Sequence, residues 1–189
     1  MVPPLTLAEA TEWSHLLLRA WSRAAYLHKD KAFAAALLLR HFTQPNLLFH
    51  QQATHLTWVL SEEEKIALLR GMLPLKDKNS PFILPDFLKY IFAPWPADIV
   101  RAALDCIANV LAPMVTNPYG EPHQRLTTLL YRLASYVPLP LAGQCTAALR
   151  PVGESYPLVA ALIEQFIDSL QFRQQLTDSL TESSTASLA

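Results

Sequence analysis

The chain has 189 residues, of which 51% are hydrophobic and only 16% are charged. Lys and Arg number 15 against 16 Asp and Glu, so the chain lacks the basic excess typical of nucleic-acid-binding proteins. The longest apolar runs, such as 32–39, are far shorter than the roughly 20 residues of a membrane span, and the first residues do not resemble a signal peptide. We therefore expect one domain over residues 1–176, located in the cytoplasm and not in contact with a membrane.

The chain contains 15 prolines and 4 glycines, and the prolines fall between stretches with helical apolar spacing. Because proline suits the first turn of a helix and disrupts its interior, the prolines mark helix boundaries. The predicted helices cover about 7–27, 30–42, 47–54, 62–73, 85–92, 97–111, 121–136, 138–149 and 157–176. No stretch alternates like a strand, which predicts an all-α fold of about eight to nine helices. The Ser- and Thr-rich residues 177–189 are predicted to form a disordered tail.

Three large side chains repeat every four residues in the helix predicted at 7–27. Trp13, Leu17 and Trp21 therefore share one side of the helix, and we expect that side to face the core. A mild basic cluster follows in the same region, formed by Arg19, Arg23, Lys29 and Lys31. We interpret this cluster as a solvated helix end rather than a track for phosphates.

The clearest local signal is the sequence Ser-Glu-Glu-Glu at 61–64. Ser61 is a good N-cap, and Glu64 stands at the position that completes a capping box. The acidic run also suits the positive end of the helix dipole. The helix that follows is predicted to direct Ile66, Leu69 and Leu73 inward.

The sequence Ala-Pro-Trp-Pro at 93–96 interrupts two apolar-periodic stretches. We predict a turn between antiparallel helices, in which Pro94 ends the first helix, Pro96 begins the second and Trp95 folds over the joint. The same order, in which a helix ends at a tight turn and a new amphipathic helix follows, occurs at 57–69, 91–104 and 135–149. Such hairpins cannot bury their apolar sides alone, which predicts stacking of neighbours into an α-α superhelix.

These alternating helices, with a Pro-Trp-type turn followed by "ADIVRAALDCI", resemble HEAT-like helical repeats. Together with the earlier "LSEEEKIALLRGML", they are also similar to an uncharacterised bacterial helical family. Its members are often encoded beside MoxR-type AAA+ ATPases, von Willebrand factor A-domain proteins and SWIM zinc-finger proteins. The resemblance covers roughly residues 45–150 and implies a protein partner, such as a AAA+ ATPase or an A-domain protein. It implies no activity and no functional residues.

From the sequence we assign no catalytic residue, metal ligand or cofactor. Among six histidines, His50 and His55 lie five residues apart, which does not suit a helical zinc pair, and no acidic residue lies between them. No nucleophile elbow is present. Cys106 and Cys145 lie far apart and are interpreted as small buried side chains.

Three residues are candidates for partner binding: Trp58, Trp95 and Arg101. Both tryptophans lie near predicted turns, where an indole either fills the core or anchors a partner. Arg101 lies between Asp98 and Asp105, where it also fits a row of surface ion pairs. The leading hypothesis is a non-enzymatic protein–protein interaction module. The alternatives are an enzyme, such as a hydrolase with dispersed catalytic residues, and a nucleic-acid-binding helical repeat with a basic stripe.

Overall fold

A computed structural model describes residues 7–43, 56–73 and 83–186. These ranges form helices and turns without a β-strand, so the predicted all-α class is confirmed. No helix in them is both long and apolar enough to cross a membrane. The chain divides into two compact units, Met1–Ser80 (unit 1) and Pro81–Ala189 (unit 2). The single domain predicted over 1–176 stays a prediction, because two compact units can belong to one domain.

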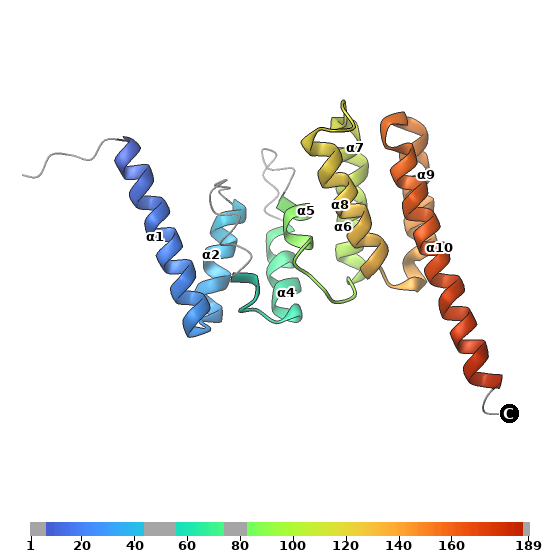
Figure 1. The fold of residues 1–189 in the computed structure, drawn as a ribbon, viewed down its shortest axis with the longest axis horizontal. Coiled ribbons are helices and arrows are strands. Elements are labelled where there is room, and N and C mark those ends of the chain that lie inside the picture. Colours follow the sequence, from blue (N-terminus) through green and yellow to red (C-terminus); the bar gives the residue numbers. More distant parts are fainter. Residues whose placement is uncertain (1–6, 44–55, 74–82, 187–189) are drawn as a thin grey trace, which may run out of the picture. The chain divides into compact units, whose positions relative to one another are not determined.

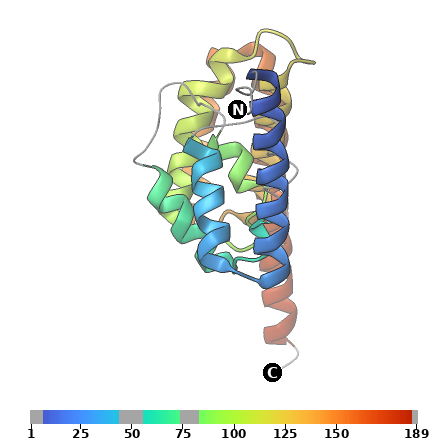
Figure 2. The same cartoon turned by 90° about the vertical axis from the view of Figure 1, so that its left-hand side faces the viewer.

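Unit 1 begins with an antiparallel hairpin of α1 (Leu7–His28) and α2 (Lys31–Thr43) (Figures 1 and 2). Lys29 adopts a left-handed conformation, with φ of 53°, and Asp30 N–H donates to Ala25 O at 3.1 Å, which is the pattern of a Schellman stop. The Asp30 carboxylate then accepts a hydrogen bond from Phe33 N–H at 3.0 Å and caps α2. A two-residue turn therefore ends one helix and begins the next.

The side of α1 that packs inward differs from the predicted one. Ser22 and Ala25 are buried, whereas Leu17 and Trp21 are exposed. On α2, the small residue Ala34 is fully buried. The prediction of Trp21 in the core was therefore wrong, and the Trp13 side chain lies outside the described part of the chain.

Unit 1 also contains α4 (Glu62–Met72), and its predicted capping box is confirmed. Ser61 Oγ accepts from Glu64 N–H at 3.3 Å, and Ser61 N–H donates to the Glu64 carboxylate at 2.7 Å. Lys31 Nζ of α2 lies 2.9 Å from the same carboxylate. These hydrogen bonds, first that from the Ser61 backbone and then that from Lys31, lower the pKa of Glu64. Ile66 and Leu69 are buried as predicted, and Met72 is buried at the end of the helix, where Leu73 was expected.

Unit 2 consists of helices connected mostly by proline-containing turns (Figure 1). They are α5 (Ile83–Leu88), α6 (Ala97–Cys106), α7 (Ala112–Met114), α8 (Glu121–Tyr136), α9 (Ala142–Ser155) and α10 (Pro157–Ala186). A π-helical turn, Ile107–Leu111, joins α6 to α7, and a 3₁₀ turn, Leu139–Leu141, leads into α9. The helices α9 and α10 form a hairpin, and α8 packs against α5 and α10.

The helix α10 extends beyond Thr177, where the sequence predicted a disordered tail. After Pro157 it contains neither proline nor glycine, and hydroxyls support the final turns by bonding to carbonyls four residues earlier. Thr177 Oγ1, for example, donates to Arg173 O at 2.9 Å. The Ser- and Thr-rich composition therefore does not end the helix before Ala186.

Trp95 fills the joint between α5 and α6, as the turn sequence predicted. Its side chain is 0% exposed and stacks on Tyr136 of α8, with ring centroids 6.4 Å apart and an interplanar angle of 19°. Its backbone N–H donates to Tyr136 O at 2.9 Å. The turn is thereby fastened to the end of α8. Pro96 is the N-cap of α6, one position before the predicted first-turn site, and α5 ends at Leu88 rather than at Pro94.

We expect Trp95→Ala to lower the free energy of unfolding by about 3–5 kcal/mol, because it removes a large, fully buried ring. Trp95→Phe should cost clearly less, since it keeps a ring against Tyr136. It also removes an indole N–H that has no hydrogen-bond partner among the described residues. Denaturant unfolding of the three proteins measures the difference. Equal stability of Trp95→Ala and the native chain would contradict a core role for Trp95.

Candidate functional site

The three residues predicted to bind a partner do not form one site. Trp58 precedes α4 in unit 1 and is 58% exposed. Trp95 and Arg101 belong to unit 2, and Trp95 is buried. Because its ring lies in the core, Trp95 cannot anchor a partner in this conformation, and that part of the prediction is corrected. Arg101 is exposed on α6 and stays a prediction.

An exposed apolar surface of unit 1 runs along α1, and we call it the α1 face. It consists of Leu16, Leu17, Ala20, Trp21, Ala24 and Leu27, joined by Phe33 of α2. Trp21 and Phe33 meet edge to face with ring centroids 6.5 Å apart, which continues the surface from α1 onto α2. Residues on a helix are separated by about 100°, so Ala20 and Ala24 form a low row between two rows of larger side chains. The apolar spacing predicted that Leu17 and Trp21 share this side of the helix, but it placed that side in the core.

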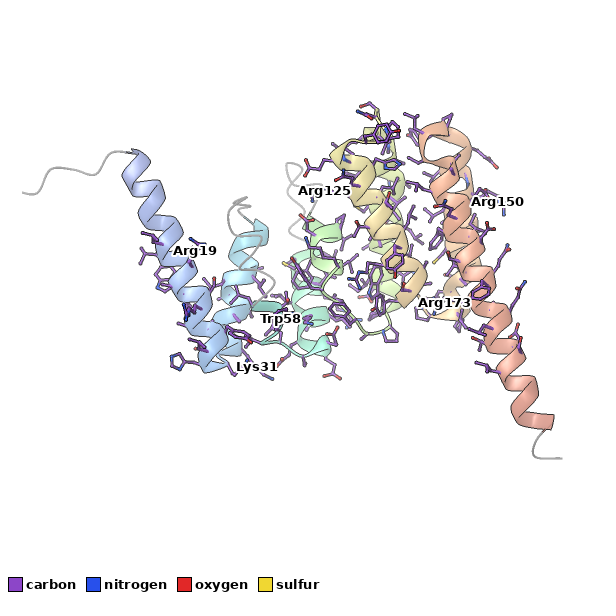
Figure 3. All side chains as sticks on the ribbon, in the orientation of Figure 1. Arg19, Lys31, Trp58, Arg125, Arg150 and Arg173 are labelled. Carbon is purple, nitrogen blue, oxygen red and sulfur yellow. The ribbon has the colours of Figure 1, made fainter. Side chains whose placement is uncertain are left out.

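Basic residues border the α1 face. At 100° per residue, Arg19 and Arg23 lie along one edge of it, and Lys29 and Lys31 follow at the hairpin turn. Figure 3 labels Arg19 on α1 and Lys31 near the turn. With Asp30 as the one carboxylate between residues 16 and 31, this segment has a formal charge of +3. Lys31 is engaged with Glu64, and Lys29 Nζ lies 4.0 Å from the centroid of the Tyr26 ring. The apolar surface is therefore accompanied by positive charge.

Trp58 belongs to a second aromatic patch of unit 1 (Figure 3). Its ring meets Tyr26 edge to face at 6.3 Å between centroids. Tyr26 lies about 140° around α1 from Trp21, so the two aromatic pairs occupy different sides of that helix. The indole of Trp58 is held by Tyr26 while more than half of its surface stays accessible. This arrangement is compatible with the predicted partner contact.

In unit 2, Arg125 connects α5 and α8. Its guanidinium lies 2.6 Å from both Asp86 and Glu121, and Lys89 lies 3.7 Å from Asp86. These residues line a surface hollow of about 240 Å³. Two carboxylates facing two cations leave no formal excess charge for a ligand, so the network acts as a brace between helices.

A second polar contact ties α10 to α8. The Arg173 guanidinium donates to Ala134 O and to Val137 O, the latter at 3.2 Å (Figure 3). These carbonyls lie at the end of α8, where the helix dipole favours a cation. Nearby, Arg132 lies over the exposed Phe92 ring, 4.9 Å from its centroid, and Phe92 meets Tyr136 edge to face. These contacts therefore cover the outer side of the joint between α5 and α6 that Trp95 fills.

Groups suited to metal binding or nucleophilic chemistry do not gather in the described part of the chain. There, no three His, Cys, Asp or Glu side chains are placed to hold a metal ion. His50 and His55, the pair considered in the sequence, lie outside the described residues. Cys106 and Cys145 are both buried, as predicted. Burial raises the pKa of the Cys145 thiol to about 11, which disfavours the reactive thiolate.

Residues 4–180 of the chain match the model of a family of unknown function, DUF5691. The chain belongs to this family. No curated protein and no solved structure matches the chain. The DUF5691 match includes the α1 face, the Trp58 patch, the Arg125 network and α10 as far as Leu180. The surfaces described above therefore all lie within the family region.

We expect Arg125→Ala to lower the free energy of unfolding by about 1–3 kcal/mol, because it leaves the half-buried Asp86 carboxylate without its closest cation. Arg125→Lys should recover part of the loss, since lysine retains the charge but cannot reach both carboxylates in the same way. Thermal unfolding of both variants tests this expectation. An unchanged stability of Arg125→Ala would show that the network does not brace α5 and α8.

We expect Cys145 to resist alkylation in the folded protein. Its pKa is raised from an ordinary 9.0 to about 11, so its thiolate fraction at pH 8 is about a hundredfold below that of an ordinary thiol, and burial further limits access. Iodoacetamide labelling in a Cys106→Ser background, with and without denaturant, measures the difference. Because the folded state favours the neutral thiol, this group's stabilising effect is complete below pH 9 and is lost as the pH rises through 11. Rapid labelling of the folded chain at pH 8 would contradict the assignment.

Proposed function

We propose that this protein is a non-enzymatic protein-interaction module, and that the α1 face binds an acidic, amphipathic helix of a partner protein. The observation that carries the proposal is the exposure of Trp21, which is 41% accessible, together with Leu16 and Leu17 on the same helix. Large apolar side chains gathered on one surface, with a charged border, are typical of binding sites in folded proteins.

The composition of the α1 face supports this kind of binding. Tryptophan and arginine are enriched among residues that dominate binding energy, and both occur here, as Trp21 with Arg19 and Arg23. Removing a large apolar side chain from water contributes about 1.5–3 kcal/mol. The two rows of large side chains, separated by alanines, fit a ridge of a packed helix. The charge of +3 over residues 16–31 favours an acidic partner.

The resemblance noted in the sequence suggests the class of partner. We propose a AAA+ ATPase or a von Willebrand factor A-domain protein, since these are encoded beside the family that the chain resembles. Such a partner fits the cytoplasmic location expected from the sequence. Trp58, supported by Tyr26, would supply a second contact, and Arg101 of unit 2 a further one.

We expect Trp21→Glu to weaken capture of the partner at least tenfold, because it places a carboxylate on the surface that receives an acidic helix. Tagged protein is incubated with native lysate and treated with a carbodiimide, which couples lysine amines to carboxylates in direct contact. Mass spectrometry should identify an acidic helical peptide of another protein joined to Lys29 or Lys31.

Tyr119→Glu is the matched control, because Tyr119 is an exposed aromatic residue of unit 2, 86% accessible, outside the α1 face. It should capture the partner as the native chain does. Equal capture by Trp21→Glu and Tyr119→Glu would refute the assignment of the α1 face. The existing Lys31–Glu64 contact provides an internal coupling standard within each chain.

A further inference from the structure

The final part of α10 carries a stripe of exposed apolar residues, which we call the α10 stripe. Phe172, Leu176 and Leu180 are 65%, 51% and 62% exposed. A spacing of four residues places them along one side of the helix, over a length of about 12 Å. In Figure 1 this part of α10 continues well beyond the first turn of α9. An amphipathic helix is therefore presented outside the packed part of unit 2.

The remainder of unit 2 holds the α10 stripe in this orientation. Phe166, Ile167 and Leu170 are buried on another side of α10. Arg173, next to Phe172 in the chain, is fastened to the end of α8 through two carbonyl oxygens. Turning the stripe inward would break these contacts. Its exposure thus follows from how the rest of α10 is packed.

The charge of α10 is opposite to that of the α1 face. The helix contains four carboxylates, in Glu164, Asp168, Asp178 and Glu182, and one cation, Arg173, a formal charge of −3. The segment 16–31 around the α1 face has a formal charge of +3. Complementary charge on two surfaces favours their association and selects their orientation.

The shapes of the two surfaces also correspond. On α10, large side chains at every fourth position form a ridge. On α1, Ala20 and Ala24 form a low row between the larger Trp21 and Leu27, over a length of about 17 Å between residues 16 and 27. A ridge of about 12 Å can lie along this row.

We propose that the α10 stripe of one molecule binds the α1 face of a second copy of the same chain. The proposal rests on the function assigned to the α1 face: a second copy supplies the acidic helix when the partner protein is not bound. The two surfaces differ, so the contact is heterologous, and a pair joined by a single contact leaves one α1 face and one α10 stripe available. Such contacts continue into chains or close into rings.

Sedimentation velocity over a range of protein concentrations tests the assembly. The native chain should form species larger than a dimer, whereas Trp21→Glu and Leu176→Glu should each stay monomeric at concentrations where it assembles. An equimolar mixture of these two variants retains one intact α10 stripe and one intact α1 face, so it should form a 1:1 dimer that does not grow. Tyr119→Glu should assemble like the native chain. A native chain that stays monomeric at every concentration, or a mixture that stays monomeric, would overturn the proposal.

Carbodiimide coupling of mixed ¹⁴N- and ¹⁵N-labelled protein identifies the contact. Peptides that join Lys29 or Lys31 to Asp168, which lies one turn before Phe172 beside the α10 stripe, should contain one light and one heavy partner. The Lys31–Glu64 link should join peptides of the same label only, because it lies within one unit. Links from these lysines to α10 that never mix labels would show contact within a chain and refute association of copies.

The outcomes separate this proposal from the proposed function. Leu176→Glu alters the α10 stripe and leaves the α1 face intact, so it should still bind a different partner protein from lysate. If the native chain is monomeric while Trp21→Glu loses a lysate partner that Leu176→Glu retains, the second-copy proposal fails and the proposed function stands. If Trp21→Glu changes neither assembly nor capture, both fail.

Discussion

The burial of small residues on α1 and α2 is the constraint on which the candidate binding surface depends. Ser22 and Ala25 on α1 and Ala34 on α2 are all buried. The two-residue turn at Lys29 and Asp30 reinforces this geometry, because it leaves little freedom in how the hairpin closes. Once the small side faces inward, the large apolar residues of α1 face outward.

Unit 2 is organised differently. A bulky side chain fills the turn before α6, and an arginine binds the carbonyl groups at the end of α8. Trp95 lies beneath the turn before α6 and stacks on Tyr136, while Arg173 approaches the last carbonyls of α8 from α10. Both contacts involve the end of α8. This end therefore fixes the position of the turn before α6 and the direction of α10. The α10 stripe is exposed because α10 is held here.

The sequence predicted helix type and many boundaries well, because local chemistry decides them. The capping box at Ser61 and Glu64 involves residues three apart, and α8 begins and ends where expected. The stop of α10 was placed too early. Composition suggested disorder after Thr177, yet disruption of a helix requires a backbone effect, such as that of proline or glycine, and neither occurs there. The π-helical turn at Ile107–Leu111 was not predicted, because its apolar pattern does not differ from that of an α-helix.

The candidate site was less predictable, because it depends on which of two plausible sides of a helix packs inward. Trp13, Leu17 and Trp21 follow a regular apolar spacing, and spacing alone does not distinguish a core side from a binding side. The distinction required the folded structure, in which Ser22 and Ala25 are buried and Trp21 is exposed. Trp95 and Trp58 illustrate the same limit, since both lie near turns, and only the contacts of each with its neighbours separate a buried ring from an exposed one.

The composition of the chain is consistent with these surfaces. The chain has 51% hydrophobic and 16% charged residues, and seven of the fifteen large apolar side chains exposed in its described part lie on α1 and on the end of α10. The few charges are also unevenly placed, with +3 beside the first surface and −3 along the helix that carries the second. Random association of apolar patches would need no such division of charge. Opposite charges beside the α1 face and the α10 stripe favour contact between these two different surfaces. They disfavour contact between two copies of the same surface, so the copies associate in one orientation.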